Sequence, residues 1–290
     1  MGKWKLGIIG GSGLYAIDAL EDARWISIDT PWGAPSDALL TGRIGDVQCV
    51  FLPRHGRGHR IPPSELPFRA NIDALKRCGV TDVVSISAVG SLAEEMPPGT
   101  FVAVDQFIDR TVARPASFFG TGLVAHVSLA DPVCPRLSSL VAAAAVASGA
   151  PVAERATYLA MEGPQFSTRA ESHLFRQWGA HVIGMTAMPE ARLAREAELP
   201  YALIGMVTDY DCWREDEAPV EVEAVIARMN ANAAIARDLI TRLAHSLPAD
   251  RTPSPIDTCL DMAIITPPDA WDAGLATKLD AILARHLRSG

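Results

Sequence analysis

The sequence has few cysteines and no apolar stretch long enough to cross a membrane. Its five cysteines lie far apart and form no C-x-x-C pair, so neither a disulfide framework nor a structural zinc site is expected. No apolar run approaches the ~20 residues of a membrane-spanning helix, and the N-terminus has no signal-peptide architecture. These absences predict a cytoplasmic protein with reduced thiols and no membrane partner.

The sequence also lacks an excess of positive charge. Its 26 Lys and Arg stand against 34 Asp and Glu, a net charge of −8, so a nucleic-acid-binding face is not expected. A single pocket can still be locally positive and bind a small anion. With 290 residues, 49% of them hydrophobic, the chain can bury a sizeable core.

Short apolar runs alternate with amphipathic segments from residue 5 to residue 245. We expect strands at residues 6–9, 47–52, 83–86, 101–104, 156–160, 181–183 and 202–207. We expect helices at residues 67–78, 134–148, 167–178 (with Ser167 as N-cap), from Pro189 onward, and at 220–245. This alternation predicts an α/β domain with a largely parallel sheet.

The segment after residue 247 differs in composition. Residues 248–255 are rich in proline and polar side chains, as is typical of a linker. A strand at 262–265 and a helix near 269–287 are expected beyond it. We therefore predict one domain over residues 1–247 and a linker with a C-terminal extension over 248–290, packed on the same domain.

Three expected strands end in small or basic residues that could bind an anion. Residues 10–13 (Gly-Gly-Ser-Gly) fit a phosphate loop, a dinucleotide fingerprint with 25–29 as the second strand, or a structural turn. Arg54 and His55 follow the next strand and could bind phosphate or belong to a surface basic cluster. Residues 87–91 form a third small-residue loop or a tight turn. Three such loops together favour a compact phosphate held from several sides.

The later strand ends carry residues suited to a sugar and a base. Phe166 could stack on a base or belong to the core, and Met185 offers an apolar surface for a sugar ring beside the Thr186 hydroxyl. Asp209 and Asp211 could bind a metal, accept hydrogen bonds from a base, or be solvated turn residues. A metal would need more ligands close by, and none is obvious.

Six strings in this order and spacing resemble the 5′-methylthioadenosine phosphorylases of the trimeric purine nucleoside phosphorylase family. They are residues 7–14 (GIIGGSGL), 54–56 (RHG), 87–91 (SAVGS), 162–164 (EGP), 184–190 (GMTAMPE) and 208–213 (TDYDCW). The resemblance covers about residues 5–245. It implies a mixed central sheet partly closed into a barrel and flanked by helices, no metal, no organic cofactor, and a homo-oligomer, either a trimer or a dimer of trimers.

The implied reaction is methylthioadenosine plus phosphate giving adenine plus 5-methylthioribose 1-phosphate. The resemblance implies a phosphate site made of Ser12, Arg54, His55, Ser87, Ala88 and Thr186. It implies nucleoside contacts from Phe166, Ser167, Met185, Asp209, Asp211, Val222 and Val225, with His126 reaching into a neighbouring subunit's site.

Chemistry gives the implied roles a reason. The leaving purine gains negative charge, so a proton or hydrogen bond from Asp209 at N7 would assist it, while phosphate attacks C1′. Carboxylates accept hydrogen bonds, which suits the adenine amino group better than a 6-oxo group. Gln165 departs from the Arg that is usual in the family. The alternatives are a 6-oxopurine or methylthioinosine phosphorylase, a nucleotide-binding oxidoreductase, and a non-catalytic binding protein.

Overall fold

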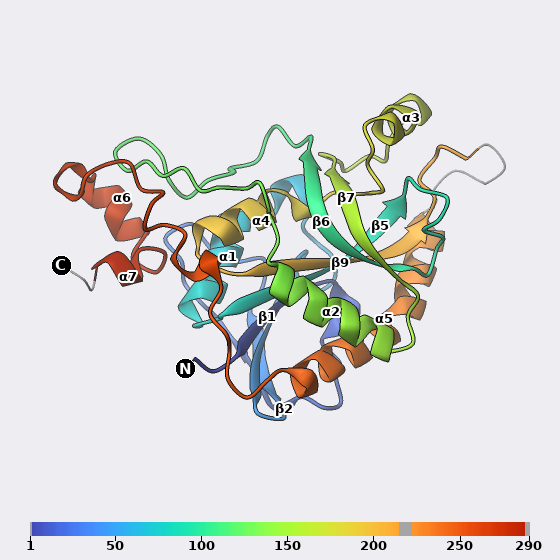
Figure 1. Ribbon diagram of the computed structural model, residues 1–290, viewed down its shortest axis with the longest axis horizontal. Coiled ribbons are helices and arrows are strands. Elements are labelled where there is room, and N and C mark those ends of the chain that lie inside the picture. The colour runs from blue at the N-terminus through green and yellow to red at the C-terminus, as the bar shows by residue number, and fades with distance from the viewer. Residues whose placement is uncertain (1, 215–221, 288–290) are drawn as a thin grey trace.

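The computed structural model describes residues 2–214 and 222–287, without the side chains of Ser12, Ala224 and Met229. Within them, one sheet of nine strands forms the centre of the molecule (Figure 1). The strands are β1 (Lys5–Gly10), β2 (Glu21–Ile26), β3 (Leu39–Ile44), β4 (Val47–Pro53), β5 (Asp82–Ser91), β6 (Phe101–Asp109), β7 (Val152–Ala160), β8 (Val182–Gly184) and β9 (Tyr201–Asp209).

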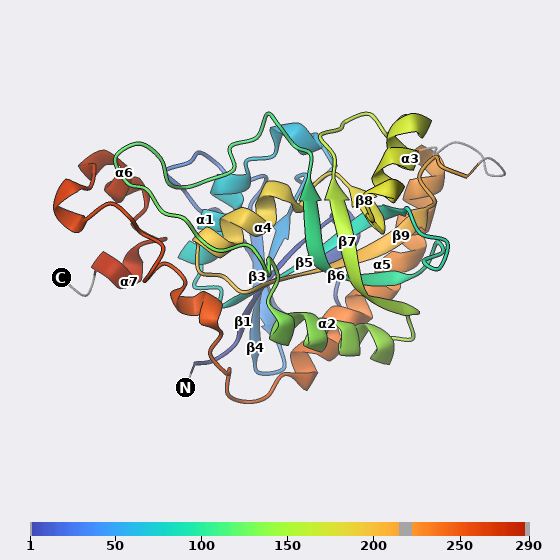
Figure 2. The same cartoon turned by 45° about the horizontal axis from the view of Figure 1, so that its top comes forward.

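The sheet is open at one end and closed at the other. Its order is β2-β3-β4-β1-β5-β8-β7-β6-β9, and β9 pairs back onto β5, so β5 to β9 close into a five-stranded barrel. Figure 2 shows β6 and β7 crossing in front of β5 and β9. The expected mixed sheet with partial barrel closure is therefore confirmed.

The expectation of a largely parallel sheet from strand–helix alternation is wrong in part. β2–β3, β3–β4, β5–β8 and β6–β9 are antiparallel. The strand β3 was not expected at all, and it pairs with β4 across a turn in which Ile44 lies opposite Val47. So short a connection forces a hairpin, because parallel strands need a long crossover.

Helices cover both faces of the sheet. They are α1 (Phe68–Arg77), α2 (Pro135–Ala147), α3 (Arg169–Gln177), α4 (Ala187–Glu196), α5 (Val222–Ser246), α6 (Ala273–Lys278) and α7 (Ala284–Leu287). Helices α1 and α4 lie on one face and α2 and α5 on the other (Figure 1). Strand β1 is buried on both faces, since Ile8 packs into the core under α2 and α5 while Ile9 packs into the core under α1 and α4.

The helix expected from 269 to 287 is wrong as one continuous helix. The chain instead forms α6 and α7 with buried Leu279, Ile282 and Leu283 in the turns between them. Asp272 caps α6 by accepting a hydrogen bond from the N–H of Leu275, which starts a new helix there. The N-cap of α3 is Thr168, not the expected Ser167. No helix in the described part of the chain is both long and apolar enough to span a bilayer.

Candidate functional site

The ends of β1, β4 and β5 lie together at one edge of the sheet. Strand β1 runs parallel to both neighbours, but it pairs with β5 only as far as Ser85. The β1-facing edge of β5 beyond Ser85 is therefore left for other partners, as is typical of ligand sites at strand ends. Residues 87–91, expected to form a loop, belong to β5, and Ser87 instead pairs with Gly205 of β9 on the other side.

Arg54 lies at this edge but is only 3% exposed. Its Nε donates to Glu190 Oε2 at 3.0 Å, and its Nη1 donates to the Ile86 carbonyl at 3.0 Å. Its Nη2 donates to Ser85 Oγ at 2.6 Å, with Ile9 O and Glu190 Oε1 each at 3.4 Å. A guanidinium has five N–H donors, and these bonds take four of them. One Nη1–H has no acceptor among the described residues, whereas the sequence suggested that the whole fork faces a phosphate.

Glu190 has a role that the sequence analysis missed. It lies in the first turn of α4, is 3% exposed, and forms the buried ion pair with Arg54. Its Oε1 also accepts hydrogen bonds from Ser85 Oγ at 2.7 Å and from the Tyr201 hydroxyl at 2.8 Å. The sequence did contain a signal for this role, because Glu190 is an acidic residue in an otherwise apolar helix start, soon after residues 184–186 (GMT). Its hydrogen bonds link the end of β4 to β5, β9 and α4, next to the residues expected to bind phosphate.

The hydroxyls of Ser87 and Thr186 lie 3.3 Å apart and join β5 to the loop after β8. The expected partner Ala88 is the next residue of β5. His55 Nδ1 lies 2.9 Å from the Ile61 carbonyl, which can only accept, so Nδ1 carries the proton. Burial, with the nearby charge of Arg54, lowers the pKa of His55 to about 4. The ring is therefore neutral at neutral pH and its Nε2 is an acceptor, suited to the O–H of HPO₄²⁻.

The glycine turn after β1 does not open an α-helix. Residues 12–14 form a short 3-10 turn (Ser12–Leu14), and the next strand is β2, which pairs antiparallel with β3. A dinucleotide fingerprint requires a strand, a tight loop and a helix N-terminus, so the oxidoreductase interpretation of this loop is wrong. The side chain of Ser12 lies outside the described part of the structure.

Asp209 ends β9, and Asp211 follows it. Asp209 Oδ2 accepts from the Thr208 hydroxyl at 2.6 Å, and Oδ1 accepts from the N–H of Asp211 at 2.8 Å. A Cβ added at Gly90 of β5 would lie 3.0 Å from Asp209 Oδ1, so a glycine there gives the carboxylate room. Burial raises the pKa of both carboxyls, and the charge of Asp209 raises that of Asp211 further. Both carboxyls therefore lie in surroundings that favour their protonated form.

The expected ribose and purine residues lie on the neighbouring loops. A Cβ added at Gly163 would lie 2.5 Å from Met185 Sδ, so the loops after β7 and β8 are in direct contact. The Cys212 thiol lies 3.3 Å from the Ser167 carbonyl, which joins the loop after β7 to the segment that carries Asp211. Phe166 is 44% exposed, so the core alternative for it is wrong. The structure thus brings the residues expected to bind phosphate and those expected to bind the purine to the same edge of the sheet.

The two valines expected at the 5′ end are less enclosed. Helix α5 packs beside the glycine turn, because Arg237 donates to the Gly13 carbonyl at 2.7 Å. Val222 and Val225 lie about four turns and three turns before Arg237 on that helix. Val222 is 56% exposed and Val225 half-buried. Among the residues that the structure describes, the valines are therefore not fully enclosed.

His126 is exposed and does not lie among these strand ends. Its N–H donates to the Ala263 carbonyl at 2.9 Å, and the N–H of Ile265 donates to Val124 O at 2.9 Å. The long loop after β6 thus pairs with the C-terminal extension, which projects from one end of the molecule while α3 lies at the other (Figures 1 and 2). The extension fixes the backbone of the segment that presents His126.

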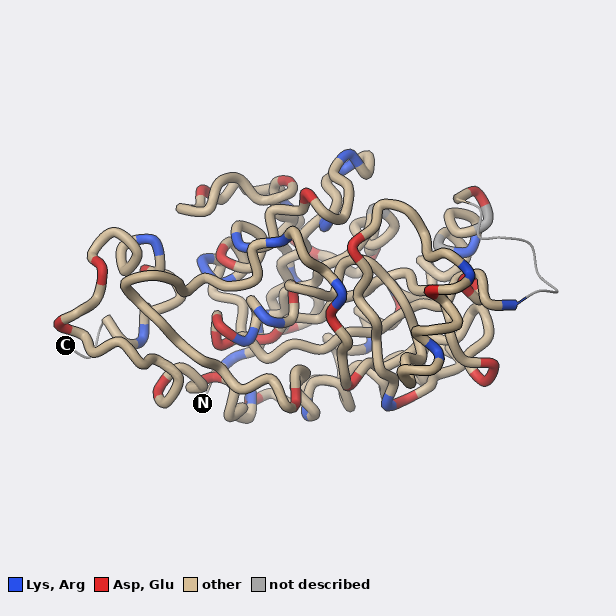
Figure 3. Tube along the Cα trace, turned by 90° about the horizontal axis from the view of Figure 1, so that it is seen from above, with Lys and Arg blue, Asp and Glu red and all other residues tan. Residues whose placement is uncertain are grey.

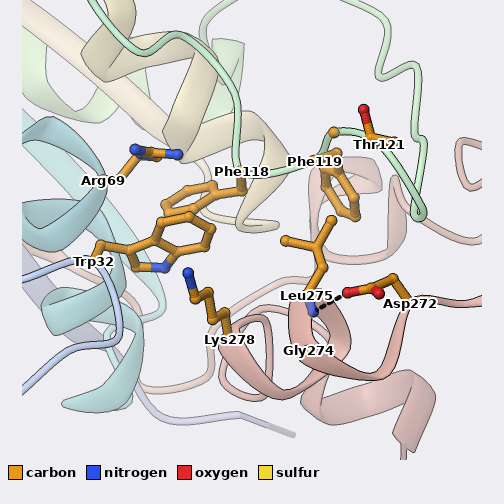
Figure 4. Close-up of a pocket in the computed structure, with 10 residues that line it drawn as sticks. Trp32, Arg69, Phe118, Phe119, Thr121, Asp272, Gly274, Leu275 and Lys278 are labelled. Atoms are coloured by element: carbon orange, nitrogen blue, oxygen red, sulfur yellow. Dashed lines mark hydrogen bonds between the residues drawn. The ribbon is translucent and has the colours of Figure 1, made fainter.

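Among the described residues, one cluster of possible metal ligands and one hollow lie away from this site. Among the described residues, the carboxylates of Glu198 and Asp261 converge with His286, but Arg285 donates to both acids and supplies the positive charge there. A hollow of about 470 Å³ between α1, the loop after β6 and α6 is lined by aromatic rings and two cations (Figure 4). Figure 3 shows Lys and Arg interspersed with Asp and Glu along the trace.

Comparison with known proteins places these features in one family. Residues 5–245 match the profile described as the phosphorylase superfamily. The chain is 58% identical over 288 residues to an S-methyl-5′-thioadenosine phosphorylase of Cereibacter sphaeroides, with 99% of each chain covered. It is 56% identical over 285 residues to the protein of that name from Bradyrhizobium diazoefficiens, with 98% of each chain covered.

Solved structures show the same likeness. A methylthioadenosine phosphorylase from an antarctic soil metagenomic library superposes with a TM-score of 0.92 at 46% identity, covering 98% of this chain and 100% of that one. A methylthioadenosine phosphorylase from Schistosoma mansoni in complex with adenine gives a TM-score of 0.80 at 38% identity, covering 84% and 91%. The resemblance stated from the six sequence strings is confirmed.

Proposed function

Because this chain belongs to the phosphorylase superfamily, we propose that it uses inorganic phosphate to cleave 5′-methylthioadenosine. The C1′–N9 bond breaks and a C1′–O bond to phosphate forms, which gives adenine and 5-methylthioribose 1-phosphate. The observation that carries the proposal is that the sheet edge with Arg54, Ser87 and Thr186, suited to phosphate, lies next to two carboxyls, the half-buried Asp209 and the buried Asp211. No metal or organic cofactor is needed for this chemistry.

Phosphate is held mainly by hydrogen bonds and little by net charge. The charge of Arg54 is balanced by Glu190, and His55 is neutral. The Ser87 and Thr186 hydroxyls, one N–H of Arg54 and the backbone of the glycine turn and of Ala88 form the donor set, with Ser12 as a further hydroxyl. Fixed donors of this kind stabilise an anion without rearranging during the reaction.

Asp209 assists departure of the base by sharing a proton with N7. Its pKa is raised by burial, which favours the protonated form. The single proton of the Thr208 hydroxyl suits both states, because its Oγ1 lies 2.6 Å from Asp209 Oδ2 and 3.2 Å from the Val89 carbonyl. It donates to an ionised Asp209, and it donates to Val89 O when Asp209 carries a proton.

The remaining nucleoside contacts come from the loops after β7 and β8 and from α5. Phe166 and Ser167 line the purine side, Met185 lies under the ribose, and Val222 and Val225 face the methylthio group. A carboxylate opposite a 6-oxo group would cost about 1–3 kcal/mol, a preference for adenine of about 10- to 100-fold. The apolar valines reject a 5′-hydroxyl less strongly.

The active form is a homo-oligomer, a trimer or a dimer of trimers, in which His126 reaches the 5′ end of a neighbouring site. The exposed position of His126 on a loop fixed by the C-terminal extension supports this role. The 56% exposure of Val222 among the described residues is consistent with it. A monomer with full activity by light scattering and rate assay would contradict the arrangement.

One second candidate has a specific observation behind it. A buried carboxyl that carries a proton can donate to O6, so the raised pKa values of Asp209 and Asp211 also allow a 6-oxopurine or methylthioinosine phosphorylase. The deciding experiment measures initial rates on methylthioadenosine, adenosine, methylthioinosine and inosine, each with and without phosphate. Faster cleavage of methylthioinosine than of methylthioadenosine would overturn the adenine assignment, and product release without phosphate would overturn phosphorolysis.

A further inference from the structure

Arg114 is a buried cation whose side chain is 1% exposed. Its Nη1 donates to the carbonyls of Met185 at 2.6 Å and Met188 at 2.7 Å. Its Nη2 donates to the carbonyls of Glu162 at 2.6 Å and Met161 at 3.4 Å, while its Nε donates to Glu162 Oε1 at 2.8 Å. All five guanidinium donors therefore have acceptors.

Apart from the Met188 carbonyl in α4, these acceptors belong to two loops that carry residues of the proposed nucleoside site. Met161 and Glu162 follow β7 and lead to Phe166, whereas Met185 follows β8. The loops also touch each other, because Gly163 packs against Met185 with no room for a side chain. The N–H of Met161 donates to the Gly184 carbonyl at 2.9 Å, which continues the β7–β8 pairing past the strand ends.

Glu162 completes the arrangement from the other side. Its Oε2 accepts from the N–H groups of Val112 at 2.6 Å and Ala113 at 3.2 Å. Burial raises its pKa, but these N–H groups and Arg114 outweigh burial, so the pKa lies below its usual value. The carboxylate therefore stays charged and holds the segment around Arg114 against the loop after β7.

We infer that Arg114 is a positioning residue that sets the distance between the ribose floor at Met185 and the purine-side loop at Phe166. This inference rests on the proposed function and deepens it. Only a planar fork with five donors reaches four carbonyls and a carboxylate at once, and a lysine offers three donors from one atom. The phosphate residues have their own anchors, since Thr186 is bonded to Ser87 and Arg54 to Glu190.

The test compares Arg114→Met and Arg114→Lys with Arg110→Met, which removes an exposed arginine from the same segment. We expect Arg114→Met to raise the KM for methylthioadenosine by about tenfold or more, because small misplacements of a bound substrate are costly. The KM for phosphate should change by only about twofold, and Arg114→Lys should fall between wild type and Arg114→Met. Arg110→Met should stay within about twofold of wild type for both substrates.

The outcomes separate this inference from the proposed function. A wild-type enzyme that does not cleave methylthioadenosine contradicts the proposed function. An active wild type whose Arg114→Met variant keeps its nucleoside KM, or raises both KM values equally, overturns the positioning role. Failure of both Arg114 variants to fold, judged by circular dichroism and thermal unfolding, also overturns it, because Arg114 would then act on folding alone.

Discussion

The two sides of the proposed site, one assigned to phosphate and the other to the nucleoside, differ in how far the described residues enclose them. On the phosphate side, Arg54, Thr186 and Ser87 are 3%, 5% and 7% exposed. Arg54 is hydrogen-bonded to Glu190, and the hydroxyls of Ser87 and Thr186 lie within hydrogen-bond distance of each other. On the nucleoside side, Phe166 and Val222 are 44% and 56% exposed. In the part of the chain that the structure describes, one side is a fixed network of hydrogen bonds and the other is exposed.

The difference has a physical basis. Binding a small anion needs donors that are already oriented, and burial in a hydrogen-bonded network fixes them. An apolar 5′ group needs cover from other apolar groups, which a second copy of the chain or the bound substrate can supply. Substitutions on the phosphate side should therefore change the rate, the KM for phosphate and the stability. Substitutions on the nucleoside side should change the affinity for the nucleoside.

The largest effect is expected from Asp209→Asn, which acts at the boundary between the two sides. Loss of the acid that assists the purine should lower kcat/KM for methylthioadenosine by about 10²- to 10⁴-fold. The amide can donate to O6, so the relative rate with methylthioinosine should rise. Initial rates with both nucleosides measure this, and an unchanged rate with methylthioadenosine would remove Asp209 from the chemistry.

The next effect tests the fixed network beneath the phosphate. Arg54→Met leaves Glu190 buried without its partner, which should cost about 3–5 kcal/mol of stability. The double variant Arg54→Met/Glu190→Gln removes both charges and should recover much of that stability. Both should raise the phosphate KM by about tenfold or more, because a charge-assisted donor is lost.

Denaturant unfolding and phosphate kinetics measure the two quantities separately. Recovery of the phosphate KM together with stability in the double variant would contradict a direct role for Arg54.

A pH shift is expected from Thr208→Val. The Thr208 hydroxyl lowers the pKa of Asp209 against the larger opposing effect of burial, so its loss should raise that pKa further. If protonated Asp209 is the active form, activity is lost as pH rises through its pKa, and the alkaline limb of kcat should move to higher pH. Thr208→Ser keeps the hydroxyl and is the control. A limb that stays in place, or moves to lower pH, would contradict this role.

The smallest effect is expected on the open side, from Val225→Ser. A polar group facing the methylthio substituent should raise the KM for methylthioadenosine by about tenfold or less, with adenosine affected less. The phosphate KM should not change. An equal rise for adenosine and methylthioadenosine would show that Val225 does not contact the 5′ group.

Local patterns in the sequence were enough for most elements and for the strand-end site. Apolar runs such as 6–9 and 202–207 are confirmed as β1 and β9, and Thr186 and Asp209 lie at strand ends as expected. Strand β3 was missed, and the mixed directions of the sheet were expected from the family resemblance and not from the strand–helix alternation, because pairing depends on partners far away in sequence. Glu190 and Arg114 were missed for the same reason, since their acceptors and donors come from distant segments.

The sequence by itself determined the family, the α/β alternation and the residue types available to phosphate and purine, since motifs and periodicity are local properties. Only the tertiary structure decided which hydrogen-bonding groups of a side chain are already occupied and how its pKa is shifted. Arg54 has one N–H left because four donors meet Glu190, Ser85 and backbone carbonyls. Burial at the end of β9 raises the pKa of Asp209, and burial is a property of the folded chain.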